Sequence, residues 1–80
     1  MTRVFRTGNF SVYVYNETGA PHHRPHGHIK RGPQRVASVF IDTLTIFHET
    51  EPLPKSLLDR LQEEQPTMIQ TWIDLNEQDR

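Results

Sequence analysis

Two apolar patterns divide this chain of 80 residues, and their order constrains the fold more than any other feature. The first half carries short extended runs rich in β-branched and aromatic residues, of which residues 10–15 are the clearest. The second half, from Leu53-Pro54 onward, spaces its apolar residues as amphipathic helices do. Strands followed by helices indicate the α+β class, with two C-terminal helices packed on one face of a small antiparallel sheet.

The strand pattern predicts three to four strands. Residues 7–9 and 31–34 each contain a glycine and favour tight turns between extended runs. Asp42 and Thr43 mark a bend or bulge in the last and longest run, because aspartate is poor in strands. The expected strands are residues 3–6, 10–15, 26–31 and 35–47.

The helical pattern predicts two helices. Pro54 suits a first helical turn, where a missing N–H is tolerated, and Leu57, Leu58 and Leu61 follow on one face. Pro66 ends this helix or begins the next by the same logic. The second helix carries a broad apolar stripe of Met68, Ile69, Trp72, Ile73 and Leu75.

The length supports a single domain spanning residues 1–80, with a core small enough to leave its stability marginal. There is no cysteine, so neither a disulfide nor a thiolate-bound zinc ion can brace the fold. No apolar run approaches the ~20 residues that span a bilayer, and the first residues lack the apolar core of a signal peptide. We therefore expect a soluble cytoplasmic protein with no membrane partner.

The net charge of −1 conceals two oppositely charged parts. Residues 1–36 hold six Lys or Arg and one Glu, whereas residues 37–80 hold three Lys or Arg and nine Asp or Glu. A basic, histidine-rich sheet part (1–48) is thus expected beside an acidic helical part (53–78). Two interpretations stay open: the parts attract differently charged partners, or they complement each other within the fold or across a homodimer.

The segment 21–28 holds four of the five histidines. Histidine titrates near neutral pH and is the commonest metal ligand. If His26 and His28 share a strand face they can chelate a divalent metal, with His22 or His23 as a third ligand. No Cys, Asp or Glu lies between positions 18 and 41 to complete such a site. We therefore expect no cofactor, and zinc remains the alternative.

An acid–base site is another interpretation of the same histidines. Small metal-independent ribonucleases use histidine to move the proton of a 2′-hydroxyl and cations to stabilise the phosphorane. The candidate catalytic residues are His26, His28 and Arg6, and Tyr13 and Tyr15 would stack on bases. The chain has no glycine-rich phosphate loop and no nucleophile-elbow serine.

Several segments follow the pattern of a known family. Residues 2–8 read Thr-Arg-Val-Phe-Arg-Thr-Gly, an aromatic strand follows, and residues 25–29 read Pro-His-Gly-His-Ile. The strand 37–44, Leu53-Pro54 and the helix 68–76 extend the match over nearly the whole chain. In these segments the chain resembles the small bacterial proteins of the "domain of unknown function 4160" family. The resemblance implies an α+β fold and a place in a toxin–antitoxin-like pair.

The chain departs from that pattern by inserting His22-His23-Arg24 before Pro25, so a site that needs His22 or His23 would be peculiar to it. We expect an intracellular interaction module, one component of a bacterial or phage two-gene system of toxin–antitoxin type. Its basic end would bind a protein partner or a nucleic acid through Arg6, Arg24, His26, His28, Lys30 and Arg31.

The alternatives are a ribonuclease toxin using His26 or His28, a metal-binding protein using His22, His26 and His28, and a phage inhibitor of a host defence complex.

Overall fold

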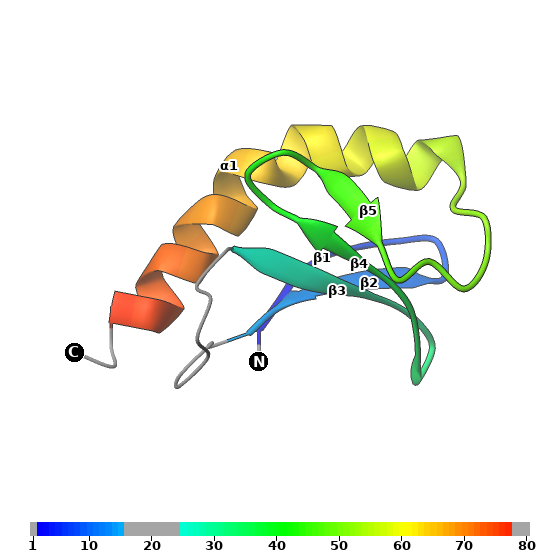
Figure 1. Cartoon of the computed structure of the whole chain (residues 1–80), viewed down its shortest axis with the longest axis horizontal. Coiled ribbons are helices and arrows are strands. Elements are labelled where there is room, and N and C mark those ends of the chain that lie inside the picture. The colour runs from blue at the N-terminus through cyan, green and yellow to red at the C-terminus, as the bar shows by residue number, and fades with distance from the viewer. Residues whose placement is uncertain (1, 16–24, 78–80) are drawn as a thin grey trace.

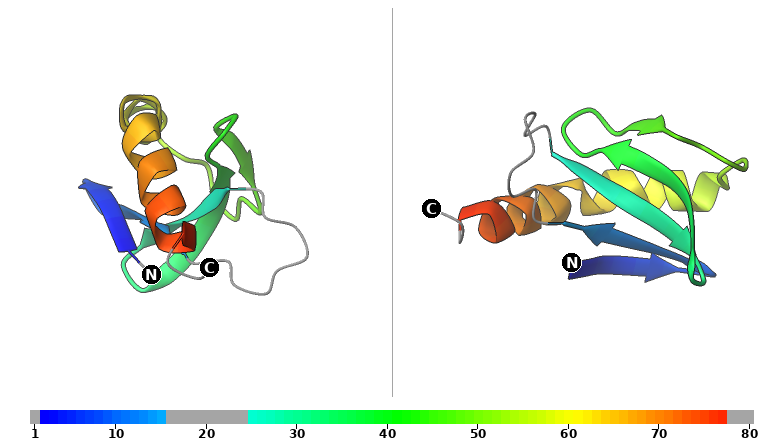
Figure 2. Two further views of the ribbon diagram at one scale, coloured as in Figure 1. Left: turned by 90° about the vertical axis from the view of Figure 1, so that its left-hand side faces the viewer. Right: turned by 60° about the horizontal axis from the view of Figure 1, so that its bottom comes forward.

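The structure, a computed structural model, describes residues 2–15 and 25–77, which form a five-stranded antiparallel sheet and one helix (Figure 1). The strands follow one another across the sheet in chain order: β1 (Thr2–Thr7), β2 (Phe10–Val14), β3 (His26–Arg31), β4 (Gln34–Phe40) and β5 (Thr45–Phe47). Helix α1 (Lys55–Glu77) packs against β1 and β2, on one side of the sheet (Figure 2). The α+β class is confirmed, whereas the expectation of three to four strands and two helices is wrong.

Two-residue turns connect β1 to β2 and β3 to β4, and each begins with a glycine of positive φ. Gly8 has a φ of 57° and Gly32 a φ of 64°. A positive φ at the first central residue is what a type II′ turn requires, and this turn matches the twist of paired strands. Nothing lies within 4 Å of a Cβ built at either glycine, so backbone conformation rather than space selects glycine here.

The expected long strand 35–47 is two strands, because the chain reverses between Phe40 and Thr45. Leu44 has a φ of 61°, and its N–H donates to the carbonyl of Phe40 at 2.7 Å. The side-chain amide of Gln65, on α1, donates to the carbonyl oxygens of Ile41 at 2.8 Å and Asp42 at 3.2 Å. The bend expected at Asp42 and Thr43 is therefore a complete reversal that α1 stabilises.

A single helix replaces the two expected ones, because Pro66 lies inside α1 without ending it. Proline removes one N–H and crowds the carbonyl four residues earlier, here that of Gln62, so the helix bends. Figure 1 shows this bend near the middle of α1. Pro66 and Gln62 are both exposed, so water can reach the freed carbonyl. No helix among the described residues is long and apolar enough to cross a membrane.

The core fills the space between α1 and the sheet face that α1 covers. Strand alternation sends one set of side chains to this face, and α1 supplies the rest. The buried set is Phe5, Val12, Val14, Ile29, Val36, Ala37, Val39, Ile41, Leu57, Leu61 and Met68. Ile69, Trp72 and Leu75 pack against it as expected, whereas Leu58 is 38% exposed and lies outside the stripe.

Candidate binding face

The sheet face opposite α1, called the open face below, carries the candidate functional residues. The strand register arranges its side chains in rows that cross the sheet. One row is Arg6, Ser11, Lys30 and Arg35; the next is Arg3, Tyr13, His28, Ser38 and Phe47; the third is His26, Phe40 and Thr45. Arg6, Lys30 and Arg35 of the first row are called the cation row.

A β-bulge decides that Arg35 belongs to the open face. Ile29 pairs with Ala37, but after the bulge Lys30 pairs with Arg35, which leaves Val36 as the extra residue. An unbroken register would have placed Arg35 opposite Arg31 instead. The bulge thus moves the facing pair of cations to the open face, and two cations directly opposite each other destabilise a sheet by about 0.2–1 kcal/mol.

No carboxylate from the sheet offsets these cations, because none of the five strands contains Asp or Glu. Arg3 and Arg6 are exposed, and the Arg6 Nε donates to the carbonyl of Gly8 at 3.3 Å. The Lys30 Nζ lies 5.2 Å from the centroid of the Tyr13 ring. Helix α1, on the far side, carries five acidic and two basic residues, so the charges are divided between the two layers.

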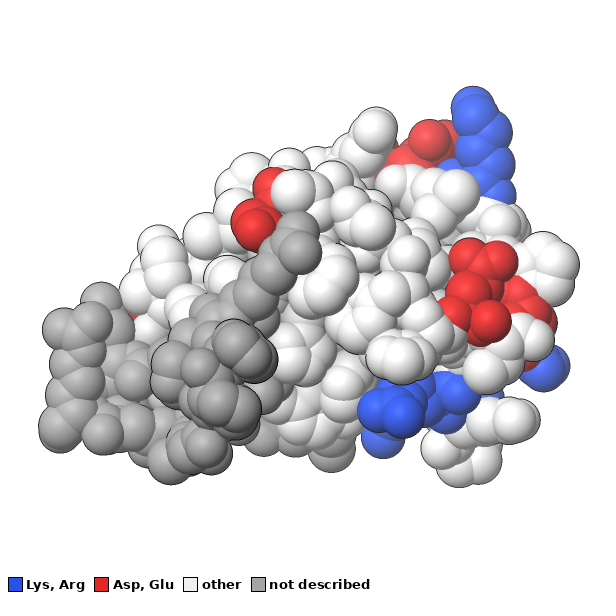
Figure 3. Space-filling view, viewed as in Figure 1, with Lys and Arg blue, Asp and Glu red and all other residues white. Residues whose placement is uncertain are grey.

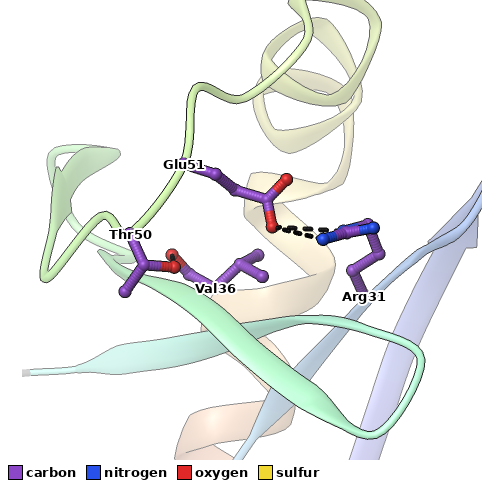
Figure 4. Close-up of polar contacts among 4 residues, drawn as sticks. All are labelled: Arg31, Val36, Thr50 and Glu51. Carbon is purple, nitrogen blue, oxygen red and sulfur yellow. Dashed lines mark hydrogen bonds and ion pairs between the residues drawn. The ribbon is translucent and has the colours of Figure 1, made fainter.

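Arg31, an expected binding residue, lies off the open face. Its Nη2 is 2.9 Å from the Glu51 Oε1 and its Nε 3.1 Å from the same oxygen (Figure 4). The N–H and hydroxyl of Thr50 both donate to the carbonyl of Val36 and hold this segment beside β4. On the face seen in Figure 3, cations near the β3–β4 turn lie beside carboxylates of the segment between β5 and α1. Here the basic and acidic parts complement each other within the fold.

Six rings form a connected group on or beside the open face, called the ring array below: Tyr15, His28, His26, Phe47, Phe40 and His48. The centroid distances are 4.4 Å from Tyr15 to His28, 5.6 Å from His28 to His26 and 6.1 Å from His26 to Phe47. Phe47 also stacks on Phe40 at 4.2 Å and meets His48 at 5.1 Å. The array therefore runs from the end of β2 to the residue that follows β5.

A pocket of about 570 Å³ opens beside the array. Its lining is His26, His28, Arg35, Ser38, Phe47, His48, Glu49 and Thr50. Burial, followed by the charges of Arg35, His26 and Lys30, lowers the pKa of His28 from 6.5 to about 4. His28 is therefore a neutral ring at pH 7, able to stack and to hydrogen-bond but adding no charge.

Gly27 separates the two strand histidines for a steric reason. A Cβ at this position would lie 2.9 Å from the carbonyl oxygen of Tyr13 in the neighbouring strand, and Gly27 is buried. Because side chains alternate along a strand, its neighbours His26 and His28 both point to the open face, as expected for a His-x-His pair.

The other expected metal and binding residues, His22, His23 and Arg24, lie outside the described residues. Within residues 2–15 and 25–77, no three His, Asp or Glu side chains are grouped closely enough to hold a metal ion. Of the expected site residues, His26, His28 and Lys30 lie on the open face of β3. Arg6 lies in the same row as Lys30, two strands away on β1.

The sequence analysis missed Arg35, Phe47 and His48. Alternation along Thr45-Ile46-Phe47 is a signal that would have placed Phe47 opposite the core. His48 follows a strand end in the left-handed conformation, with a φ of 52°, which the sequence does not reveal. Such a conformation is unfavourable for a residue with a side chain.

No protein-family model, curated protein or solved structure matches this chain. The family resemblance of its sequence therefore stays a prediction, and function has to be argued from the open face.

Proposed function

We propose that this protein is an interaction module that binds an anionic partner through its open face, as one component of a bacterial or phage two-gene system of toxin–antitoxin type. One observation carries the proposal: Lys30 on β3 pairs directly with Arg35 on the neighbouring β4, and none of the five strands contains a carboxylate. An anion bound between them would relieve their repulsion. The two-gene role rests on the family resemblance.

The same geometry supports binding more than catalysis. A general base is most effective when its pKa lies near the working pH. With a pKa of about 4, His28 is a weak base at neutral pH. The ribonuclease hypothesis therefore gains less support from the open face than the binding hypothesis does.

Heparin, a sulfated polyanion without bases, provides a test of anion binding. Arg35→Gln should weaken heparin binding by about 3- to 5-fold, the contribution of one partly exposed ion pair. Arg31→Gln is the matched control, because it removes the same charge from the same hairpin but from the Glu51 pair off the open face. Equal losses in both variants, or no heparin binding by the wild type, would contradict the proposal.

The two-gene role has its own test. The protein should form a complex with the product of the neighbouring gene on co-expression, seen by native mass spectrometry. Arg31→Gln should retain the complex and Lys30→Gln/Arg35→Gln should lose it. Absence of a complex with the wild type would contradict the assignment to such a system.

A further inference from the structure

We propose that the anionic partner is a single-stranded nucleic acid, whose phosphates lie along the cation row and whose bases stack on the ring array. This inference rests on the proposed function, because it specifies the ligand of the same open face. Three features carry it: the length of the ring array, its position relative to the cation row, and a carboxylate in the pocket.

The ring array joins six rings with centroids 4.2–6.1 Å apart. His48 is exposed and the other five residues are half-buried, so each keeps some accessible surface. Nucleobases stack on such side chains with little regard to sequence, because every base has a π face. His28 and His26 add imidazole rings to the tyrosine and phenylalanine rings. An acidic peptide would neutralise the cation row but would leave most of these surfaces unused.

The positions of the cations and rings suit a nucleotide chain. Neighbouring rows are two residues apart along each strand, or roughly 6.6 Å. This separation is comparable with that between a phosphate and its own base. The cation row extends from β1 to β4, over roughly 14 Å at the usual spacing of strands. We therefore expect the face to bind two to three nucleotides.

The pocket discriminates between a nucleic acid and an acidic protein. Its volume of about 570 Å³ is sufficient for a nucleotide, and Arg35 lines it together with His26 and Phe47. Glu49 lines the same pocket. Its carboxylate would repel an acidic side chain or a phosphate, but it can accept a hydrogen bond from the exocyclic amino group of cytosine, so the pocket suits a base while the phosphates lie on the cation row.

The need for base stacking also favours a single strand over a duplex as the ligand. The base faces of a duplex are covered by neighbouring bases, so its bases cannot lie flat on the array. A single strand exposes them. The cation row alone would bind duplex and single strand through phosphate, and only the ring array distinguishes the two.

The test measures the binding of labelled octamers of deoxycytidine by fluorescence anisotropy, beside an abasic octamer with the same phosphates, a duplex and a deoxythymidine octamer. The deoxycytidine octamer should bind most tightly. With three phosphates neutralised, its affinity should fall roughly 20-fold between 50 and 200 mM salt. A ribocytidine octamer extends the test to RNA, and binding of either cytidine octamer above the abasic one supports the proposal.

Phe47→Leu removes a ring from the array and should weaken binding of the deoxycytidine octamer roughly 5- to 20-fold, with heparin binding unchanged. Phe10→Leu is the matched control, because Phe10 packs against the core on the other side of the sheet, and it should leave both affinities unchanged. Thermal unfolding of each variant confirms that it is folded under the binding conditions.

Two results would overturn the inference in different ways. If the abasic and deoxycytidine octamers bind equally while Arg35→Gln still weakens heparin binding, anion binding stands and base stacking is refuted; the partner would then be an acidic protein. If neither octamer nor heparin binds, the proposed function fails together with the inference.

Discussion

Acidification should destabilise this protein through His28. The folded chain lowers the pKa of His28 to about 4, chiefly by burial and then through the charges of Arg35, His26 and Lys30. The unfolded chain has the ordinary pKa of 6.5. Between these values the unfolded state binds a proton that the folded state does not, so the free energy of unfolding falls as the pH falls through this window. Above pH 6.5 the ring of His28 is neutral in both states, and the free energy of unfolding carries no loss from its protonation.

The size of the effect follows from the two pKa values. Each pH unit between them corresponds to about 1.4 kcal/mol, which sets an upper limit of about 3 kcal/mol on the loss between pH 7.5 and pH 4. His28 is only partly buried, so solvent screening reduces this to about 1–2 kcal/mol.

Urea unfolding of the wild type and of His28→Gln at pH 7.5 and pH 4.5 measures this contribution. The other titrating groups affect both proteins, so the wild type should lose about 1–2 kcal/mol more than the variant on acidification. NMR titration of the ring protons should place His28 near pH 4, and Arg35→Gln should raise that value because it removes a neighbouring cation. Equal losses in both proteins, or a His28 titration near 6.5, would refute the reasoning.

Four further substitutions test the fold by thermal or urea unfolding. Gly27→Ala should lose about 1–3 kcal/mol, because its Cβ would force two strands apart. Gly8→Asn should lose less than about 1 kcal/mol, since asparagine tolerates a positive φ and the site is open; equal losses at the two glycines would argue against the steric explanation. Pro66→Ala should gain about 1 kcal/mol by restoring a helical hydrogen bond, and a loss would mean that packing requires the bend. Arg35→Gln should gain about 0.2–1 kcal/mol by removing the repulsion from Lys30, so a stability loss would indicate a structural role.

The sequence predicted those features whose cause is local. Gly8 and Gly32 identify the hairpin turns because these backbone conformations favour glycine. Alternation placed His26 and His28 on one face. Asp42 indicated a bend, but the complete reversal that leads into β5 is hydrogen-bonded by the amide of Gln65, which lies 23 residues away. No local pattern contains that contact.

The remaining differences have non-local causes. Pro66 is a sound signal for a helix end, yet the stripe from Leu57 through Met68 is buried on both sides of it. Burial of that stripe favours a bent helix over two separate ones. Arg35 was missed because a bulge, which has no sequence signature here, determines the strand face on which it lies.

The order of elements has a consequence for synthesis. Each strand pairs with the next one along the chain, so the sheet can form hairpin by hairpin as it leaves the ribosome. Helix α1 follows β5 and ends 30 residues after it. At a synthesis rate of 5–20 residues per second, Val12, Ile29 and their apolar neighbours stay uncovered for roughly 2 to 6 seconds. During that interval the apolar side of the nascent sheet stays exposed to water, and it is covered only when α1 packs against β1 and β2.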